Sequence, residues 1–380
     1  MGHGEAVRLR GGARGERRRD GPPGRERGLG RARRRPGAGR GGDVVRPCQR
    51  GHRRGPPRAA RRALGASGVP GRAAAGARGG PPAGAVTPAL AAVERALLRP
   101  GARDVTGLGA AVPGQLARLA GELAAAGQAR SRVGLVTGVH IAWAPTPAAE
   151  TDGPVGVAVL AAALATLGAE PVVLTDDPCA GVTGACLAVL GAGRLEVVPV
   201  AADEAAVAGT VADLGPSHLV AVERLGPNTE GRVMTMRAVD VTASTAPLHA
   251  AFALPGLVTG AVGDGGNEIG MGNVPADVVA ACVAHGARIA CRVPVDALVV
   301  AGTSNWGCCG LIAALALLVP QHGPALRALL DPAVDAAVLD AATAAGGIDG
   351  VTGRPGASVD GVRVADHADL LAGLRALARA

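Results

Sequence analysis

The sequence contains no lysine and no tyrosine, and its aromatic side chains are limited to one phenylalanine and two tryptophans. Without lysine, the chain cannot form a Schiff base, attach pyridoxal phosphate or build a Walker-type phosphate loop. The shortage of aromatic rings argues against stacking on nucleic-acid bases. All 39 basic residues are therefore arginines, a bias that indicates a GC-rich coding sequence.

The seven cysteines form no CxxC pair, which argues against a zinc knuckle or a redox pair. An odd number of scattered cysteines without a secretory signal indicates a reducing compartment, so we expect a cytoplasmic protein. The longest apolar stretches, near residues 155–169 and 308–319, are shorter than a membrane span. We therefore expect no membrane association.

Charge divides the chain near residue 80. Residues 1–80 hold 22 arginines against five acidic residues, a net charge of +17, whereas the rest holds 17 against 26, a net charge of −9. Residues 1–85 are also rich in glycine and proline and lack a hydrophobic period, so we expect a disordered extension. Three interpretations stay open: a non-native extension, a tail that binds nucleic-acid phosphates, and a transit peptide.

From residue 86 onward, short apolar runs alternate with helical segments, which is typical of βαβ units. We therefore predict that residues 86–380 form one α/β domain, a three-layer Rossmann-like sandwich with a largely parallel or mixed central sheet. Expected strands lie at 133–139, 171–175, 195–200, 218–222, 257–262, 288–292 and 297–300. Expected helices lie at 88–98, 112–126, 153–167, 181–190, 202–214, 276–285, 310–319 and 324–344.

Polar residues follow several of these strands, and ligands bind outside the carboxyl ends of strands in open α/β sheets. The most informative segment is residues 263–270, Gly-Asp-Gly-Gly-Asn-Glu-Ile-Gly, which follows a buried strand. Glycine lets a ligand approach the backbone, and carboxylates supply hard metal ligands or proton-transfer groups. We expect these strand ends to meet in one acidic pocket.

Each segment also has a purely structural interpretation. Thr151 and Asp152 are suitable caps for the helix that follows them, and Ser304 with Asn305 could cap another helix. Glu223 and Arg224 could form a structural ion pair. The 263–270 loop could be a tight turn with surface carboxylates, although turns seldom need four glycines and two acids.

Taken in order, these segments resemble the C-terminal cyclase domain of the D-glutamate cyclase family. The resemblance rests on ETDGP at 150–154, ERLGPN at 223–228, GDGGNEIGMG at 263–272, TSNWG at 303–307, DGVTG at 349–353 and SVDG at 358–361. Each motif alone is weak, whereas the ordered set across residues 90–375 is specific. The resemblance implies a hydro-lyase that converts D-glutamate to 5-oxo-D-proline and water, with a divalent metal, Mn²⁺ or Mg²⁺.

This reaction assigns hypothetical roles to the side chains at the strand ends. A cation that polarises the γ-carboxyl group needs oxygen ligands, and a base and an acid must move protons. The metal candidates are Asp152, Asp264, Glu268, Asp349 and Asp360. The catalytic candidates are Glu150, Asp152, Glu223, Asp264 and Glu268. The substrate-binding candidates are Thr151, Arg224, Asn228, Arg237, Asn267, Ser304 and Asn305.

Two other functions remain open at this point. A metal-dependent phosphoesterase could use the same residue types, although such sites usually contain several histidines. A nucleic-acid-binding protein could act through residues 1–85 alone. The expected partner is otherwise a small molecule, D-glutamate, and a homo-oligomer is consistent with the sequence.

Overall fold

The computed structural model describes residues 86–101, 103–356 and 358–379. The expectations for residues 1–85 lie outside this part of the chain, and the domain boundary at residue 86 stays a prediction.

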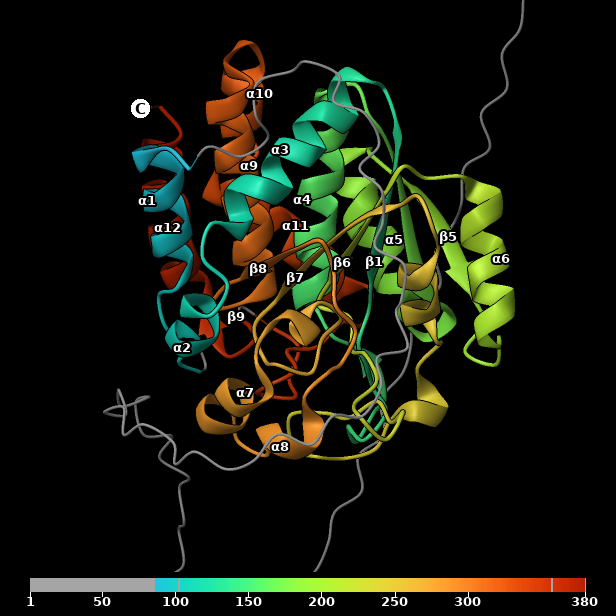
Figure 1. Ribbon diagram of the computed structural model, residues 1–380. Coiled ribbons are helices and arrows are strands. Elements are labelled where there is room, and N and C mark those ends of the chain that lie inside the picture. Colours follow the sequence, from blue (N-terminus) through green and yellow to red (C-terminus); the bar gives the residue numbers. More distant parts are fainter. Residues whose placement is uncertain (1–85, 102, 357, 380) are drawn as a thin grey trace, which may run out of the picture. The chain divides into compact units, whose positions relative to one another are not determined.

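A six-stranded parallel sheet forms the centre of the described fold (Figure 1). Its order is β5-β4-β1-β6-β7-β8, and all five neighbouring pairs are parallel. Its central strands are continuously apolar and buried, as expected for strands covered on both faces. The strand bounds are β1 Arg132–Thr137, β4 Glu170–Asp176, β5 Arg194–Val198, β6 His218–Val222, β7 Val258–Gly263 and β8 Ala297–Val300.

One face of the sheet carries most of the described helices. Helices α4 (Asp152–Thr166) and α9 (Ser304–Leu318) pack against each other and are apolar around most of their circumference. A helix of this kind must be covered on all sides. The other helices of this face supply that cover: α1 Pro88–Leu97, α3 Gln115–Gln128, α5 Asp177–Leu190, α10 Gly323–Ala328, α11 Pro332–Ala344 and α12 Val364–Leu377.

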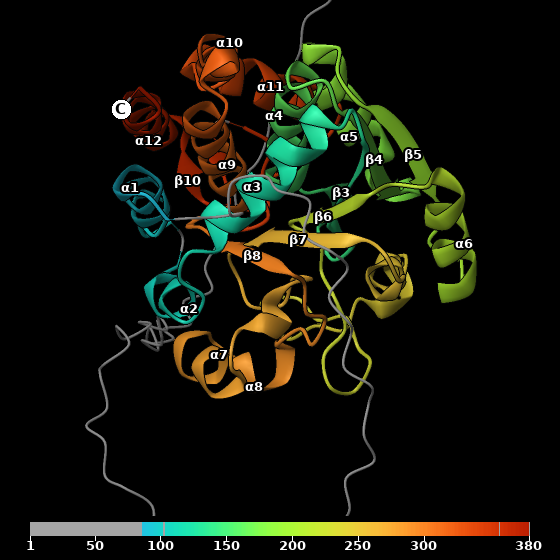
Figure 2. The same ribbon diagram turned by 45° about the horizontal axis from the view of Figure 1, so that its top comes forward.

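The opposite face is covered more thinly, as Figure 2 shows. Its second hydrophobic core contains residues of α2 (Thr106–Ala110), α6 (Glu204–Leu214), α7 (Ala276–Cys282) and α8 (Gly286–Ile289). Helices on both faces of a parallel sheet confirm the predicted three-layer Rossmann-like sandwich.

Small antiparallel pairs lie outside the main sheet. Strands β2 (His140–Ile141) and β3 (Ala148–Ala149) form one pair, which leads directly to Glu150. Strands β9 (Ser358–Val359) and β10 (Val362–Arg363) form another, and the turn between them holds Asp360.

Several elements differ from the predicted ones. The expected strand at 288–292 is the end of helix α8 and the loop after it, because an apolar run as short as 289–291 does not distinguish helix from strand. The expected helix at 324–344 divides into α10 and α11, because Asp331 caps a new helix that begins at Pro332. Helices α2 (Thr106–Ala110) and α12 and the short strands at 140–141, 148–149, 358–359 and 362–363 were not predicted.

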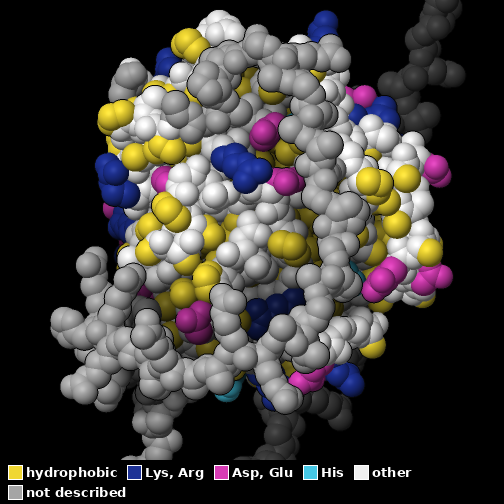
Figure 3. Space-filling view, viewed as in Figure 1, with side chains coloured by type: hydrophobic (Ala, Val, Ile, Leu, Met, Phe, Trp, Pro, Cys, Tyr) yellow, Lys and Arg dark blue, Asp and Glu magenta, His cyan; other side chains and the backbone are white. Residues whose placement is uncertain are grey.

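The surface mixes charged and apolar side chains. In the space-filling view of Figure 3, arginine and acidic side chains are interspersed among apolar ones on the visible face. Strand β5 lies at one edge of the sheet and exposes Val197, which is 43% accessible. The predicted homo-oligomer is not tested by these features.

No single helix in the described residues is long and apolar enough to cross a bilayer. Helices Ser304–Leu318 and Pro320–Ala328 are long and apolar enough only when taken together, and a 115° bend separates them.

Candidate active site

A cavity of about 130 Å³ lies beside the carboxyl ends of β6 and β7. This volume admits a small ligand and is below the roughly 300 Å³ at which drug-sized sites begin. Val139, Leu225 and Trp143 contribute apolar wall. Seven predicted site residues line it, confirming that the strand ends converge: Glu150, Glu223, Arg237, Asp264, Asn267, Glu268 and Asp360.

Three buried carboxylates meet at one side of this cavity. Asp152, Glu223 and Asp264 each offer an oxygen, and these atoms lie within 4.8 Å of one another. Burial raises the pKa of Glu223 and of Asp264 well above the ordinary value, and burial followed by the charge of Asp360 raises that of Asp152 to about 7. The cluster therefore favours binding of a proton or another cation.

Glu150 has no hydrogen-bond partner for its carboxylate among the described residues. Burial, followed by the charges of Asp360 and Asp152, raises its pKa well above the ordinary value. Gly350 lies directly against it, because a Cβ atom at that position would come within 1.8 Å of Oε1 of Glu150. The carboxylate is therefore free to exchange a proton with a bound ligand.

Glu223 follows β6 and adopts a left-handed backbone conformation with φ of 44°. This conformation is strained for a residue other than glycine and is found most often at functional sites. The Oγ of Ser304 donates a 2.6 Å hydrogen bond to Oε2 of Glu223. The turn and the serine together fix the direction of this carboxylate.

Asp152 caps a helix other than its own. Its carboxylate accepts hydrogen bonds from the backbone N–H groups of Ser304, at 2.9 Å, and Asn305, at 2.6 Å, where α9 begins. The predicted cap of the helix after Asp152 is therefore wrong, because this carboxylate caps α9 instead and joins the first turns of α4 and α9. The hydroxyl of Thr151, beside it, is buried without a partner and does not line the cavity.

The 263–270 loop folds around one of its own side chains. The carboxylate of Glu268 accepts hydrogen bonds from the backbone N–H groups of Gly265, at 2.6 Å, and Gly266, at 2.8 Å. Gly266 and Gly270 have φ of 92° and 98°, which side chains rarely adopt. Glu268 therefore shapes the loop, and the loop holds Asp264 in the cavity, where its Oδ2 atom has no described partner.

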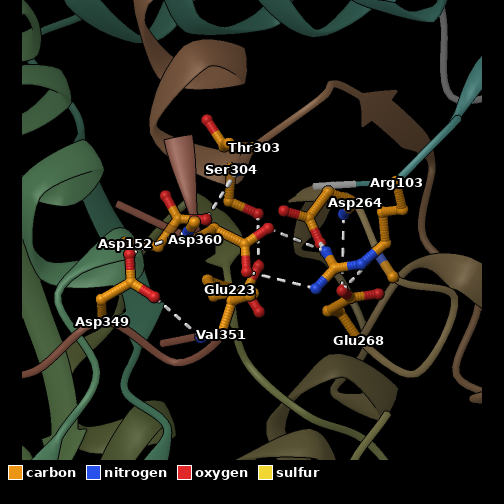
Figure 4. Close-up of polar contacts among 12 residues, drawn as sticks. Arg103, Asp152, Glu223, Asp264, Glu268, Thr303, Ser304, Asp349, Val351 and Asp360 are labelled. Carbon is orange, nitrogen blue, oxygen red and sulfur yellow. Dashed lines mark hydrogen bonds and ion pairs between the residues drawn. The ribbon is translucent and has the colours of Figure 1, made fainter. Parts of the chain in front are cut away.

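Arg103 lines the cavity and was not among the residues predicted from the sequence. Its guanidinium forms an ion pair with Asp264 and two hydrogen bonds with Asp360, at 3.0 and 3.2 Å (Figure 4). It comes from the segment before α2, where no motif or hydrophobic period distinguishes it from the other arginines. The one available signal was indirect, because so many clustered acids require a counter-charge.

The structure does not bring Arg224 or Asn228 to the cavity. Arg224 is 1% exposed, pairs with Asp176 at 2.8 Å, and donates to the carbonyls of Gly138 and Ala246. Asn228 binds backbone groups of its own loop and the carbonyl of Arg288. Both side chains hold loops together, and the Glu223–Arg224 ion pair considered from the sequence is absent among the described contacts.

Asp349 and Asn305 also lie behind the cavity wall. Asp349 accepts hydrogen bonds from the N–H groups of Val351, Thr352 and Gly361, which joins the loop after α11 to the β9–β10 turn. The side chain of Asn305 contacts Thr303 and His367. Arg237 lies at the exposed rim, where it donates to the carbonyl of Val351 at 3.3 Å.

The donor set is suitable for a hard divalent cation. Its members are carboxylate oxygens, which Mg²⁺ and Mn²⁺ prefer, and Asp264 offers an unpaired oxygen. Backbone N–H groups already occupy oxygens of Asp349, Glu268 and Asp152, and among these three only Asp152 lies in the cluster with Glu223 and Asp264. No histidine lines the cavity in the described part of the chain, which weakens the phosphoesterase interpretation.

A Rossmann-like sheet with a small acidic cavity at its strand ends defines a binding site for a small cationic or zwitterionic molecule. Residues 95–375 match the family described as D-glutamate cyclase-like, C-terminal, and the chain belongs to this family, as predicted. It is 34% identical over 216 residues to "D-glutamate cyclase, mitochondrial" of Homo sapiens, covering 52% of this chain and 35% of the human protein. The chain thus spans about a third of that relative's length.

Proposed function

We propose that the protein is a D-glutamate cyclase, a hydro-lyase that converts D-glutamate to 5-oxo-D-proline and water. The family supports the reaction class. The observation that carries the proposal is the placement of two carboxyl groups with raised pKa, Glu150 and Glu223, on one small cavity that two arginines also line.

The reaction needs both a proton acceptor and a proton donor. The α-amine forms a bond to the γ-carboxyl carbon, and one carbon–oxygen bond of that carboxyl group breaks. Two protons leave the ammonium nitrogen, and two protons reach the departing oxygen to form water. Because the substrate releases as many protons as the water needs, carboxyl groups that exchange protons inside the cavity are sufficient.

Glu150 is the proposed base and Glu223 the proposed acid. The carboxylate of Glu150 has no partner among the described residues, so it can accept a proton from the ammonium group. Burial and the neighbouring acids favour the protonated form of Glu223, and Ser304 fixes its direction. The two carboxyl groups differ in their hydrogen bonds, since Ser304 binds Glu223 and no described residue binds the Glu150 carboxylate, and we assign them opposite proton-transfer steps on this ground.

Positioning supplies the rest of the catalysis. The reacting amine and carboxyl group belong to one molecule, so the cavity must hold the folded conformer. Good orientation of this kind lowers the activation free energy by up to roughly 7–11 kcal/mol. The acidic side of the cavity attracts the ammonium group, and Arg237 at the rim binds the α-carboxylate. Asn267 lines the same wall, held by its hydrogen bond to the carbonyl of Met234.

Asp152 and Asp264 would hold a divalent cation, Mn²⁺ or Mg²⁺, beside the carboxyl group of Glu223, which stays the proton donor. When bound, such a cation polarises the γ-carboxyl group as a Lewis acid. Asp360 and Glu268 line the same cavity and add negative charge near such a cation. Their oxygens already accept hydrogen bonds, from Arg103 and from the loop backbone respectively. Binding is tested by calorimetric titration with MnCl₂, in which Asp264→Asn should abolish the heat that wild-type protein gives.

The activity is tested by incubating purified protein with D-glutamate or L-glutamate, with and without Mn²⁺ and with EDTA. Chiral chromatography should show 5-oxo-D-proline from D-glutamate, with loss of the product in EDTA. Folded protein that yields none contradicts the proposal. Release of phosphate from a generic phosphoester would instead favour the phosphoesterase alternative.

The proposed cellular setting is the cytoplasm. It rests on the cysteine pattern, whereas the human relative is named as mitochondrial. Fractionation of the source cells followed by immunoblotting tests this proposal, and enrichment in an organelle or membrane fraction contradicts it.

A further inference from the structure

We propose that Arg103 binds the side-chain carboxylate of the substrate, and so makes the site selective for amino acids that carry a γ-acid. This inference rests on the proposed cyclase function and extends it to a residue that no motif of the sequence contains. It assigns the two substrate carboxylates to two different arginines, Arg103 inside the cavity and Arg237 at its rim.

The hydrogen-bond inventory of Arg103 leaves one edge of the guanidinium unused. An arginine has five N–H donors. Nη1 donates to Asp264 and Asp360, and Nη2 donates once to Asp360. The Nε–H and the second Nη2–H have no partner among the described residues, and they lie on the same edge. This edge is a fork that matches the two oxygens of a carboxylate.

The unused edge belongs to a side chain that is open to the cavity. Arg103 lines the cavity, and its side chain is 22% exposed. Arg224 provides the contrast, because its Nε also lacks a partner among the described residues but its side chain is only 1% exposed and does not line this cavity. Arg224 has a purely structural environment, whereas Arg103 combines buried counter-charges with an accessible donor pair.

The position of Arg103 favours the γ-carboxylate over the α-carboxylate. The carboxyl group that reacts must lie near the proton donor, Glu223, and Arg103 lies within electrostatic reach of that residue (Figure 4). Asp264 and Asp360 fix the guanidinium on two sides, so it can meet the negative charge that develops on this group without reorganising. Arg237 is exposed at the rim and suits the group that does not react.

Two amino acids that each lack one carboxylate separate these assignments. 4-Aminobutyrate keeps the amine and the γ-carboxylate, whereas D-2-aminobutyrate keeps the amine and the α-carboxylate. Titration calorimetry with each is performed on wild-type protein, Arg103→Lys and Arg237→Lys. Lysine preserves the charge but loses the planar fork.

Arg103→Lys should weaken 4-aminobutyrate binding roughly tenfold to hundredfold, the range for a charged hydrogen bond, and change D-2-aminobutyrate binding less than about threefold. Arg237→Lys should give the reverse pattern. Equal losses for both ligands in Arg103→Lys, a loss confined to D-2-aminobutyrate, or no loss would each overturn the inference. Wild-type protein that binds only D-2-aminobutyrate would also overturn it.

A second variant keeps the test valid if Arg103→Lys does not fold. The double substitution Arg103→Met with Asp360→Asn removes the guanidinium together with the carboxylate that binds it. Compared with the single variant Asp360→Asn, the double variant should bind 4-aminobutyrate more weakly and D-2-aminobutyrate about equally well. Turnover of D-glutamate by wild-type protein is measured in parallel. If wild-type protein turns over D-glutamate but the variants do not change binding of the two aminobutyrates as expected, only the role of Arg103 is rejected. Folded wild-type protein without turnover rejects the cyclase function itself.

Discussion

Asp176 and Arg224 form an ion pair of 2.8 Å in which both side chains are 1% exposed. The pair joins the end of β4 to the loop after β6, and Arg224 also anchors the carbonyls of Gly138 and Ala246. The sequence suggested that Arg224 binds substrate, yet its donors are directed at the protein. Its buried position predicts an effect on stability.

Replacing Arg224 by Met should destabilise the protein by about 3–5 kcal/mol, because Asp176 is left buried and unpaired. Urea denaturation measures the free energy of unfolding. Arg363→Met is the matched control, since the 77% exposed Arg363 pairs with Asp366 at the surface and should cost less than about 1 kcal/mol. Equal losses in the two variants would contradict the structural assignment.

Asp264→Asn should lower kcat at least roughly a hundredfold while the protein stays folded, because it removes a charge from the centre of the site. Steady-state assays with D-glutamate and thermal melting measure the two quantities. Asp277→Asn, on the exposed side of α7, is the control and should retain wild-type kinetics. Full activity in Asp264→Asn would exclude this residue from catalysis and from metal binding.

Gly350→Ala should impair activity at least about tenfold, because the new methyl group would occupy the position of the Glu150 carboxylate. Gly181→Ala in α5 is the control, since a Cβ atom there meets nothing within 4 Å and alanine favours the helix. Unchanged kinetics in Gly350→Ala would show that the place of Glu150 is not critical.

The pKa of Asp152 predicts how stability depends on pH. Burial raises this pKa from 3.8 to about 7, so between these values the folded protein binds a proton that the unfolded chain does not. The free energy of unfolding therefore falls as pH rises, by at most about 1.4 kcal/mol per unit, and levels off above about pH 7. Burial lowers the pKa of His367 from 6.5 to about 4, so its contribution to the free energy of unfolding rises with pH between these values.

Comparison of wild-type protein with Asp152→Asn cancels the contribution of His367. The difference in unfolding free energy between the two proteins should decline from pH 4 to pH 7 and then stay constant. Urea titrations at half-unit pH intervals measure it, without added divalent metal. A difference that does not vary with pH would show that Asp152 titrates normally.

The sequence predicted the strands and the acidic residues that follow them, because both are recognised from short segments of the chain. Short apolar runs located the strands, and the acids that follow them had to converge where parallel strands end. Glu150, Glu223 and Asp264 were found in this way, and the cavity contains all three. The glycines of the 263–270 loop also indicated a backbone with positive φ, which residues with a side chain rarely adopt.

Side-chain direction could not be predicted in the same way. Arg224 and Asp349 lie in motifs beside true cavity residues, but their partners, Asp176 and the 351–361 backbone, are set by tertiary packing. Arg103 lies outside every motif and reaches the site across 161 residues from Asp264. Contacts of this kind depend on how the segment before α2 packs, which composition and periodicity do not specify.

The central claim is that Glu150 and its neighbouring acids cyclise D-glutamate. The most direct measurement follows D-[5-¹³C]glutamate by NMR with wild-type protein and with Glu150→Gln, from pH 4.5 to 9. Wild-type protein should convert the carboxylate signal to a lactam carbonyl, with a rate that rises at pH values well above the ordinary Glu value of 4.5, and Glu150→Gln should be inactive. Absence of the lactam signal with folded wild-type protein, or equal rates in the two proteins, would contradict the account.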